Sequence, residues 1–354
     1  MLPEMDRQLS AEQITATADA IAEVQLPSGM IPWFAGGHAD PWNHVEAAMA
    51  LDYGGHMAGA ERAYQWMADI QRPDGSWHQY YIGDEVEQDK LDANVIAYVA
   101  AGTWHHFLTT SDTGFLEAMW PVVEKAVDFV LELQQPGGEI LWARHIDGTP
   151  WPFALLTGSS SIAHSLRCAI AIAIELGHER PSWELSVAQL ARAIRFRREE
   201  AFSPKHRWAM DWYYPVLAGV LSGQTGRDHL DSRFDTFLYE GEGIRCVNDR
   251  PWVTAAETCE CAIAYLGVGD TNRAIELFTL AQRLREPDGR YITGMVHPDR
   301  NLFPRDERST YSSAAVLLAV EALHGTTPAA KLFADHQFLP PIIDIDMADE
   351  PVLD

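Results

Sequence analysis

The residues best suited to chemistry are carboxylates that fall inside apolar helix patterns. Glu257 and Glu260 are three positions apart, and so share one face, in the segment AAETCECAIAYLG. Glu46 falls one turn into a second such segment, which Asp40 precedes. An unpaired carboxylate in a buried helix is costly, so each acid is expected to be paired or functional. Asp40, Asp92 and Asp211 also stand where helix N-caps are expected, a role compatible with function.

Large aromatic side chains accompany carboxylates wherever a loop leads into a helix of small residues. Aromatic rings pack on the apolar faces of pyranose rings, and carboxylates accept hydrogen bonds from sugar hydroxyls. This combination is typical of a cleft that binds a sugar chain. The residues expected to bind it are Trp42, Asn43, Glu46, Trp77, Tyr80, Asp92, Trp142, Arg144, Asp211, Trp212, Tyr213, Trp252, Glu260 and Tyr311, and Trp33, Thr254 and Arg308 stand at the same loop ends.

A weak internal repeat marks the turns that separate these loops from the preceding helices. Pro presets φ and Gly accepts a positive φ, so each copy is expected to form a turn. The copies are Gln25-Leu-Pro-Ser-Gly29, Gln71-Arg-Pro-Asp-Gly-Ser-Trp77, Gln134-Gln-Pro-Gly-Gly138 and Glu286-Pro-Asp-Gly289.

Two kinds of helix alternate along the chain. Amphipathic helices are predicted near 10–24, 57–71, 112–134, 182–200, 226–239 and 270–285. Helices of small residues are predicted to begin near Trp42, Leu91, Ser159, Tyr213, Trp252 and Ser309. Because a helix that is apolar all round is buried, this pattern predicts an all-α (α/α)6 toroid with an inner ring inside an outer ring.

The loops of this ring place the functional residues on one face. Every long loop runs from an outer helix into an inner helix, so all are expected to open on the same side and to carry function. Strands are expected only as short pairs within these loops. We predict one catalytic domain over residues 1–336, followed by an acidic, Pro-rich tail over 337–354 that wraps the surface or frays.

The composition limits the kinds of molecule that the protein is expected to bind. The 26 basic and 51 acidic residues give a formal net charge of -25, which disfavours nucleic acid and anionic membrane and suits a neutral substrate. The first residues resemble no secretory signal. The cysteines lack CxxC spacing and are expected to be reduced thiols of a cytoplasmic protein. No metal-ligand constellation or nucleotide-binding signature is apparent, so neither a metal nor a cofactor is expected.

The predicted ring suggests a catalytic pair. Hydrolysis of a glycosidic bond with inversion needs one carboxylic acid and one carboxylate base, roughly 6.5–9.5 Å apart. Asp40 and Glu257 belong to the first and fifth inner helices and would face each other across, or obliquely across, the mouth of the ring. They are the expected pair, and the residue types do not distinguish the acid from the base.

The stretch from Asp89 to Trp142 resembles the six-hairpin glycosidases, the glucoamylase-like proteins in particular. Shared features are Leu-Asp before an inner helix, a Thr-Ser-Asp turn, a Trp-Pro helix and a Gly-rich turn into Leu-Trp. Glucoamylases carry a Glu general acid just after Leu-Trp, whereas this chain has Ala143-Arg144. The proton donor must therefore come from another loop, and the candidates are Asp40, Asp92, Asp211 and Glu257.

The whole chain is similar to an actinobacterial group often labelled prenyltransferase-like. Within it, the chain most resembles mycobacterial hydrolases of methylmannose polysaccharide. The resemblance implies an endo-acting hydrolase of α-1,4 bonds between 3-O-methylated mannose units. The motifs behind it are Ile31-Pro-Trp-Phe, Asp40-Pro-Trp-Asn-His-Val-Glu46, Gln71-Arg-Pro-Asp-Gly-Ser-Trp77 and Asp211-Trp-Tyr-Tyr-Pro215.

Three other functions fit the same ring. A prenyltransferase or terpene cyclase shares the Gln-Asp-Gly-Trp punctuation, but the chain has neither a DxDD stretch nor a zinc-ligand set. A sugar epimerase or polysaccharide lyase would use His or Tyr as acid and base, and His44, His297 and Tyr213 keep that alternative open. The third is a glycan-binding module without catalysis.

Overall fold

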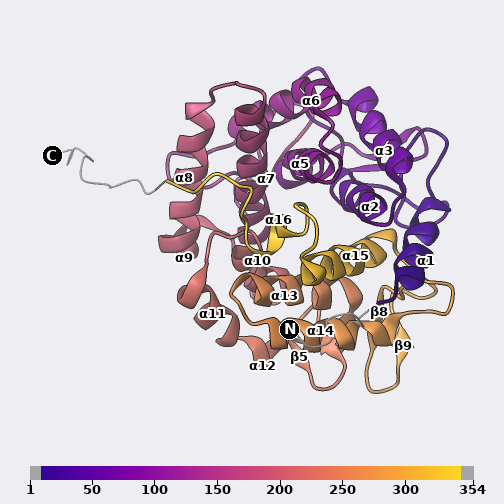
Figure 1. Ribbon diagram of the computed structural model, residues 1–354. Helices are drawn as coiled ribbons and strands as arrows, with labels where there is room; N and C mark the ends of the chain where they lie inside the picture. Colours follow the sequence, from indigo (N-terminus) through magenta and orange to yellow (C-terminus); the bar gives the residue numbers. More distant parts are fainter. Residues whose placement is uncertain (1–8, 344–354) are drawn as a thin grey trace.

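The computed structural model describes residues 9–343, whose helices form two concentric rings (Figure 1). The inner ring is made of α2 (Pro41–Tyr53), α4 with α5 (Ala93–Ala97 and Val99–Thr110), α7 (Leu156–Glu175), α10 (Met210–Leu217), α13 (Ala255–Gly267) and α15 (Thr310–His324). The outer ring is made of α1 (Ala11–Ala22), α3 (Met57–Ile70), α6 (Thr113–Leu131), α8 (Pro181–Phe196), α11 with α12 (Gly223–Asp231 and Phe234–Phe237) and α14 (Thr271–Ala281), followed by a 3₁₀ turn (Gln282–Leu284).

Each inner helix packs against the next, and α15 packs against α2 to close the ring. The predicted (α/α)6 toroid is therefore confirmed. Two short helices, α9 (Arg198–Ala201) and α16 (Lys331–Ala334), complete the helical elements of the described residues. None of the helices within 9–343 is long and apolar enough to cross a membrane.

Small residues allow the inner helices to approach closely. Almost every residue of α7 from Ser159 to Ala173 is buried. At Gly102 of α5, an added Cβ would lie 2.3 Å from Cγ1 of Val45 on α2. The outer helices instead bury one face, as α6 does with Val123 and Val127 while Glu117 is exposed.

The repeated turns fasten each outer helix to the next one. The Nε2 group of Gln71 donates to the Gly75 carbonyl of its own turn at 3.0 Å and to the Val122 carbonyl of α6 at 2.9 Å. Gln25 makes the same pair of bonds to its own turn and to α3, and Gln134 to its own turn and to α8. The Gly of each turn lies against the same neighbouring helix, where a Cβ would meet a backbone oxygen: Gly29 against Arg62, Gly75 against Lys125, Gly138 against Gln189 and Gly289 against Ala16.

The loops on the functional face are joined to one another by backbone pairing, in order around the ring. Short strands form within and between them: β1 (Tyr80–Ile82) with β2 (Glu85–Gln88), β3 (Leu91–Asp92) with β4 (Ala143–Arg144), β5 (Leu238–Tyr239) with β6 (Gly243–Ile244), and β7 (Trp252–Thr254) with β8 (Gly294–Val296) and β9 (Asn301–Leu302). Single bridges join the remaining neighbours: Ala39 with Tyr81, Ala154 with Phe202, and Trp208 with Val247. The expected short strand pairs are thus confirmed, and they form a collar around the mouth of the ring.

The other end of the ring is covered by α16 and the residues after it. Gly267, at the C-terminal end of α13, lies against α16, and the rings of His164 and Phe333 stack at 4.6 Å. Trp104 and Arg167 donate to the carbonyls of residues 338 and 340 at 3.2 and 2.9 Å. Of the predicted tail, residues 337–343 therefore run across the inner helices, and 344–354 lie outside the described residues.

A buried polar cluster ties three inner helices together. His106 of α5 lies 2.9 Å from a carboxylate oxygen of Asp52 on α2, and His105 lies 3.0 Å from Glu321 on α15. Burial lowers the pKa of His105, but the charge of Glu321 and the hydrogen bonds of both carboxylates outweigh it and raise that pKa to about 9. The cysteines Cys168, Cys246, Cys259 and Cys261 are all buried and free, as expected.

We predict that Gly75→Ala destabilises the protein more than Gly148→Ala does. Both glycines have a positive φ, of 87° and 91°, so both substitutions carry a backbone strain of about 1–2 kcal/mol. A Cβ at Gly75 would lie 2.2 Å from the Lys125 oxygen, whereas nothing lies within 4 Å of one at Gly148. The free energy of unfolding from denaturant titration should fall by about a further 2 kcal/mol in Gly75→Ala. Equal losses in the two variants would show that the contact between turn and helix contributes nothing.

Candidate active site

A cavity of about 360 Å³ opens where the collar meets the N-terminal ends of the inner helices. It lies between the start of α2, the junction of β7 with α13, and the loop before α15. Its lining consists of Trp33, Trp42, Asn43, Glu46, Met210, Cys246, Trp252, Thr254, Ala256, Glu257, Glu260, Thr293, Pro304, Glu307 and Tyr311. Of the residues expected to bind sugar, the structure therefore brings together Trp42, Asn43, Glu46, Trp252, Glu260 and Tyr311.

Asp40 caps the N-terminus of α2, as expected, and is also held by two residues of the cavity wall. Its Oδ1 accepts from the backbone N–H of Asn43 at 3.0 Å. Its Oδ2 accepts from Nε1 of Trp33 and from Nδ2 of Asn43, each at 2.7 Å. Burial raises the pKa of Asp40, and these hydrogen bonds lower it only in part. Asp40 is thus fixed in orientation by two residues of the cavity wall, although it is not itself part of the lining.

Glu257 lies on the first turn of α13 and lines the cavity itself. The hydroxyl of Thr254, at the end of β7, donates to its carboxylate. Tyr311, at the start of α15, is close enough to Glu257 and Glu307 for their charges to add to burial in raising the pKa of its phenol. Glu257 is therefore held by its own element and faces a tyrosine from the next inner helix.

Glu46 and Glu260 occupy the floor of the cavity. Oε1 of Glu46 accepts from Nε1 of Trp42 at 3.0 Å and from the Tyr98 hydroxyl at 3.3 Å. The hydroxyls of Tyr213 and Tyr214 donate to Glu260, the latter at 3.2 Å. Both glutamates are thus paired, and the hydrogen bonds come from aromatic residues.

Burial makes these floor carboxyls weak acids. Burial, the charge of Glu260 and the charge of Asp40 hold the pKa of Glu46 well above its ordinary value. Burial and the charge of Glu257 raise the pKa of Glu260 to about 8, although the hydrogen bonds from two tyrosines oppose the rise. At neutral pH Glu260 therefore keeps its proton.

These electrostatic couplings define a row of carboxyls. Glu46 senses Asp40 on one side and Glu260 on the other, and Glu260 senses Glu257. The row runs from α2 to α13, two inner helices separated by α15. Asp40 and Glu257 are the first and last members of this row, and their facing arrangement across the ring stays a prediction.

Two of the expected stacking platforms are core residues instead. Trp77 is 0% exposed and donates through Nε1 to the Met67 carbonyl at 2.9 Å. Trp212 is 1% exposed, and its ring stacks on Phe237 with centroids 5.2 Å apart. The prediction that these residues pack on sugar rings is wrong because their ring faces are covered by protein.

Tyr213 and Tyr80 contact residues that line the cavity but are not part of its lining. Tyr213 is fully buried and contacts the site through its hydrogen bond to Glu260, so it positions a carboxyl and does not face a substrate. The Tyr80 ring packs edge-on against Trp33, with centroids 5.9 Å apart. Neither side chain lines the cavity.

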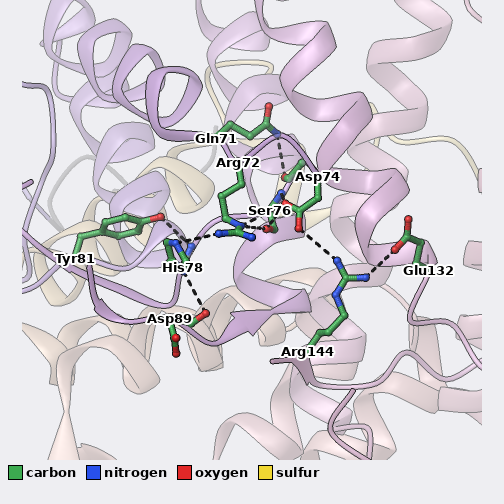
Figure 2. A network of polar contacts seen from close by, with 10 residues as sticks. Gln71, Arg72, Asp74, Ser76, His78, Tyr81, Asp89, Glu132 and Arg144 are labelled. Carbon is green, nitrogen blue, oxygen red and sulfur yellow. Dashed lines mark hydrogen bonds and ion pairs between the residues drawn. The ribbon is translucent and has the colours of Figure 1, made fainter. Parts of the chain in front are cut away.

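Asp92, Trp142 and Arg144 lie at the junction of the second and third loops, outside the cavity. Asp92 caps α4, as expected, and its carboxylate lies 3.6 Å from Nζ of Lys90, which in turn lies over the Trp142 ring. Arg144 pairs with Glu132 at 2.8 Å and reaches toward Asp74 in the turn of the second loop at 3.5 Å (Figure 2). Because the charged groups of Asp92 and Arg144 are already paired with other protein residues, we interpret this cluster as joining loops to one another.

Asp211 belongs to a different cavity, of about 150 Å³, lined by Arg198, His206 and Arg233 among others. It is the second residue of α10 rather than its N-cap, which is Ala209, so the capping prediction for Asp211 is wrong. Its Oδ1 accepts from the Thr157 hydroxyl at 3.4 Å. The structure thus separates Asp211 from the row of carboxyls.

Sequence reasoning missed part of the cavity wall. Glu307 lines it and accepts from the Thr293 hydroxyl at 3.0 Å, and burial raises the pKa of Glu307. Glu307 stands just before an inner helix, which is a usable signal, whereas its neighbour Arg308, named among the loop ends, pairs with Glu286 at 2.7 Å. Met210, Cys246, Ala256 and Pro304 carried no signal, because apolar and small residues occur throughout the chain.

The histidines considered as acid–base groups lie outside the cavity lining. Nδ1 of His44 accepts from the Ile31 N–H at 3.0 Å, and Nε2–H donates to the Ala63 carbonyl at 2.9 Å. Burial lowers its pKa to about 4, so His44 is a neutral core residue. His297 stacks on Tyr239 at 4.8 Å. Within residues 9–343, no group of three or more His, Cys, Asp or Glu side chains is arranged to hold a metal ion.

Comparison with known sequences gives a full-length relative. The MMP endo-(1,4)-3-O-methyl-alpha-D-mannosidase of Mycolicibacterium hassiacum is 50% identical over 332 residues, which are 94% of this chain and 92% of that protein. An uncharacterized glycosyl hydrolase of Methanocaldococcus jannaschii is 30% identical over 84 residues, 23% of this chain and 14% of that protein. No protein-family model matches the chain.

Solved structures with the same ring include enzymes of different activities. A glycosidase superposes with a TM-score of 0.69 at 13% identity, covering 89% of this chain and 96% of that chain. A D-mannose isomerase reaches 0.67 at 11% identity (90% and 99%), and a GH63 mannosylglycerate hydrolase from Thermus thermophilus reaches 0.62 at 13% (87% and 99%). At these identities the likeness shows the fold alone.

We predict that Glu260 makes stability depend on pH. Because its folded pKa of about 8 lies above the ordinary 4.5, the folded state holds a proton that the unfolded state releases between these values. Wild-type stability should therefore fall relative to Glu260→Gln as pH rises from about 4.5 to 8, with a limiting slope near 1.4 kcal/mol per pH unit. Denaturant titrations across this range measure the difference, with Glu117→Gln on the exposed face of α6 as the matched control. A wild-type minus Glu260→Gln difference that is flat with pH would contradict the raised pKa.

Proposed function

The chain belongs to the glycoside hydrolase family of MMP endo-(1,4)-3-O-methyl-α-D-mannosidase, and we propose that it cleaves internal α-1,4 bonds of 3-O-methylated mannose polysaccharide. The observation that carries this substrate is 50% identity over nearly the whole of both chains. The cavity supports the proposal because its lining combines carboxyls with half-buried aromatic rings, which are the groups that bind and cleave a neutral sugar chain.

Asp40 and Glu257 are the proposed catalytic pair, acting with inversion. One of them, protonated, transfers its proton to the glycosidic oxygen as the bond to the anomeric carbon breaks. The other, ionised, takes a proton from a water molecule that attacks the same carbon from the opposite face. Glu257 lines the cavity, and Asp40 accepts hydrogen bonds from Trp33 and Asn43 of its wall, so both acids adjoin the space that a sugar ring would occupy.

The remaining cavity residues would bind and orient the sugar chain. Trp33, Trp42 and Trp252 offer aromatic surface to pyranose rings, and Asn43 and Glu307 offer polar groups to hydroxyls. A protonated Glu260 would donate a hydrogen bond where an ionised one would repel an ionised Glu257. A protonated Glu260 on the floor of the cavity would therefore supply a hydrogen-bond donor without adding negative charge next to Glu257.

We expect Asp40→Asn and Glu257→Gln each to lower kcat for methylated α-1,4-mannooligosaccharides by about 10²–10⁴-fold. The reason is that an amide can neither transfer a proton to the leaving oxygen nor remove one from water. Product chains are measured by mass spectrometry, and the anomeric configuration of fresh products is read by NMR. Maltooligosaccharides of equal length test the choice of sugar.

The matched control variants are Asp112→Asn and Glu117→Gln. Asp112 caps α6 as Asp40 caps α2, and Glu117 is exposed, so both amide variants should keep wild-type kcat. Full activity in Asp40→Asn or Glu257→Gln would remove that residue from the catalytic pair. If the wild-type protein cleaves maltooligosaccharides but no methylated mannan, the proposed substrate is wrong.

A second experiment assigns the acid and the base. A mannooligosaccharide with a nitrophenyl leaving group needs little protonation, so the variant that lacks the general acid should keep most of its activity on it. The variant that lacks the base should lose activity on both substrates and regain it with azide, which replaces water as nucleophile. If both variants behave alike on the activated substrate, the opposed roles of Asp40 and Glu257 are refuted.

A further inference from the structure

A second hollow, an apolar groove of about 300 Å³, adjoins the cavity on the side of the fifth and sixth loops. Trp252 lines both spaces, and Phe303 of the groove precedes Pro304 of the cavity. The groove is therefore continuous with the proposed cleavage site across a single tryptophan.

The walls of the groove are aromatic side chains that face solvent. Trp208 is 39% exposed and Phe303 is 52% exposed, although large apolar side chains on this chain are mostly buried. Trp252 and Phe303 meet edge-to-face with ring centroids 5.1 Å apart, and Nε1 of Trp252 donates to the Phe303 carbonyl at 2.9 Å. Two exposed rings beside a fixed third ring form a concave apolar surface.

Backbone pairing makes this surface rigid. Trp208, in the loop between α9 and α10, bridges to Val247 in the next loop, and Trp252 pairs with Val296 across β7 and β8. Val247 and Val296 form the floor between the aromatic walls. A surface held on paired strands loses little conformational entropy when a ligand binds.

The polar character of the groove differs from that of the cavity. Its lining side chains, all within the described residues, include no carboxylate, amide or hydroxyl. The charged groups are the guanidiniums of Arg207 and Arg250, and Arg207 is paired with Asp249 at 2.9 Å. A free sugar hydroxyl placed here would lose water without gaining an acceptor, whereas a methyl ether would gain apolar contact.

We propose that this groove is a binding subsite for the O-methylated faces of mannose units next to the cleaved bond. The polysaccharide would cross Trp252, with the scissile bond in the cavity and the adjoining methylated units between Trp208 and Phe303. The inference rests on the proposed function, because it assigns the groove to the same substrate. It adds that methyl groups are selected outside the cavity that carries the carboxyls.

The test compares Trp208→Ala and Phe303→Ala with wild type on three substrates. These are a 3-O-methylated α-1,4-mannododecasaccharide, the unmethylated dodecasaccharide, and a methylated tetrasaccharide, which leaves few units to reach the groove. Each variant should raise KM for the methylated dodecasaccharide about tenfold and leave kcat unchanged, because only binding contacts are lost. KM for the other two substrates should change less than about twofold.

The control variant is Phe196→Ala, which removes an aromatic ring that is 77% exposed and lines neither space. It should leave KM unchanged for every substrate. Circular dichroism and melting temperature verify that each variant is folded. Phe303 is more exposed than Trp208, so Phe303→Ala provides the test if Trp208→Ala does not fold.

The outcomes separate the two proposals. If the wild-type protein cleaves the methylated dodecasaccharide and KM is unchanged in both variants, the subsite proposal is wrong and the proposed function is unaffected. If the wild-type protein cleaves no mannan, the proposed function fails. Calorimetric binding of the methylated dodecasaccharide then tests whether the groove is a binding subsite. Weaker binding to Trp208→Ala than to wild type supports the subsite, and equal binding or none overturns it.

Discussion

The contact that closes the ring also holds the candidate site together. The N–H of Thr310, at the start of the last inner helix, donates to the Trp33 carbonyl at 2.7 Å, and its hydroxyl donates to the Pro32 carbonyl at 2.8 Å. Trp33 in turn donates to Asp40, and its ring meets Tyr311 at 5.1 Å. The first and last loops therefore support each other, and the orientation of Asp40 depends on Trp33, which the start of α15 holds in place.

The row of buried carboxyls has an energetic cost that other interactions in the protein must offset. Four acids that share one apolar region repel one another and lose hydration, so their presence opposes folding. Hydrogen bonds from tryptophan and tyrosine side chains and proton uptake by Glu260 reduce that cost. The core of two concentric rings supplies the rest of the stability. Such a local conflict is expected where a site is arranged for chemistry rather than for stability.

The fold and the turn motif are shared more widely than the chemistry. The same ring occurs in a D-mannose isomerase and in hydrolases, so the toroid does not decide the reaction. The Gln-Pro-Asp-Gly punctuation has a structural explanation, because Gln71 and Gly75 fasten their turn to the neighbouring outer helix. It therefore gives no support to prenyl chemistry. The family follows from the full-length relative, which confirms the resemblance inferred from the sequence motifs.

The ring and its functional face are predictable from the sequence, because alternating helix types, repeated turns and long loops are local patterns. The sequence also singled out Asp40, Glu46, Glu257 and Glu260, since an acid in an apolar helix is conspicuous without a structure. Which aromatic residues face a cavity depends on the tertiary structure. Trp77 and Trp252 both lie in long loops that lead into inner helices, yet one is covered by the core and the other lines two adjoining spaces. The difference arises from contacts between loops far apart in the chain, which no local pattern encodes.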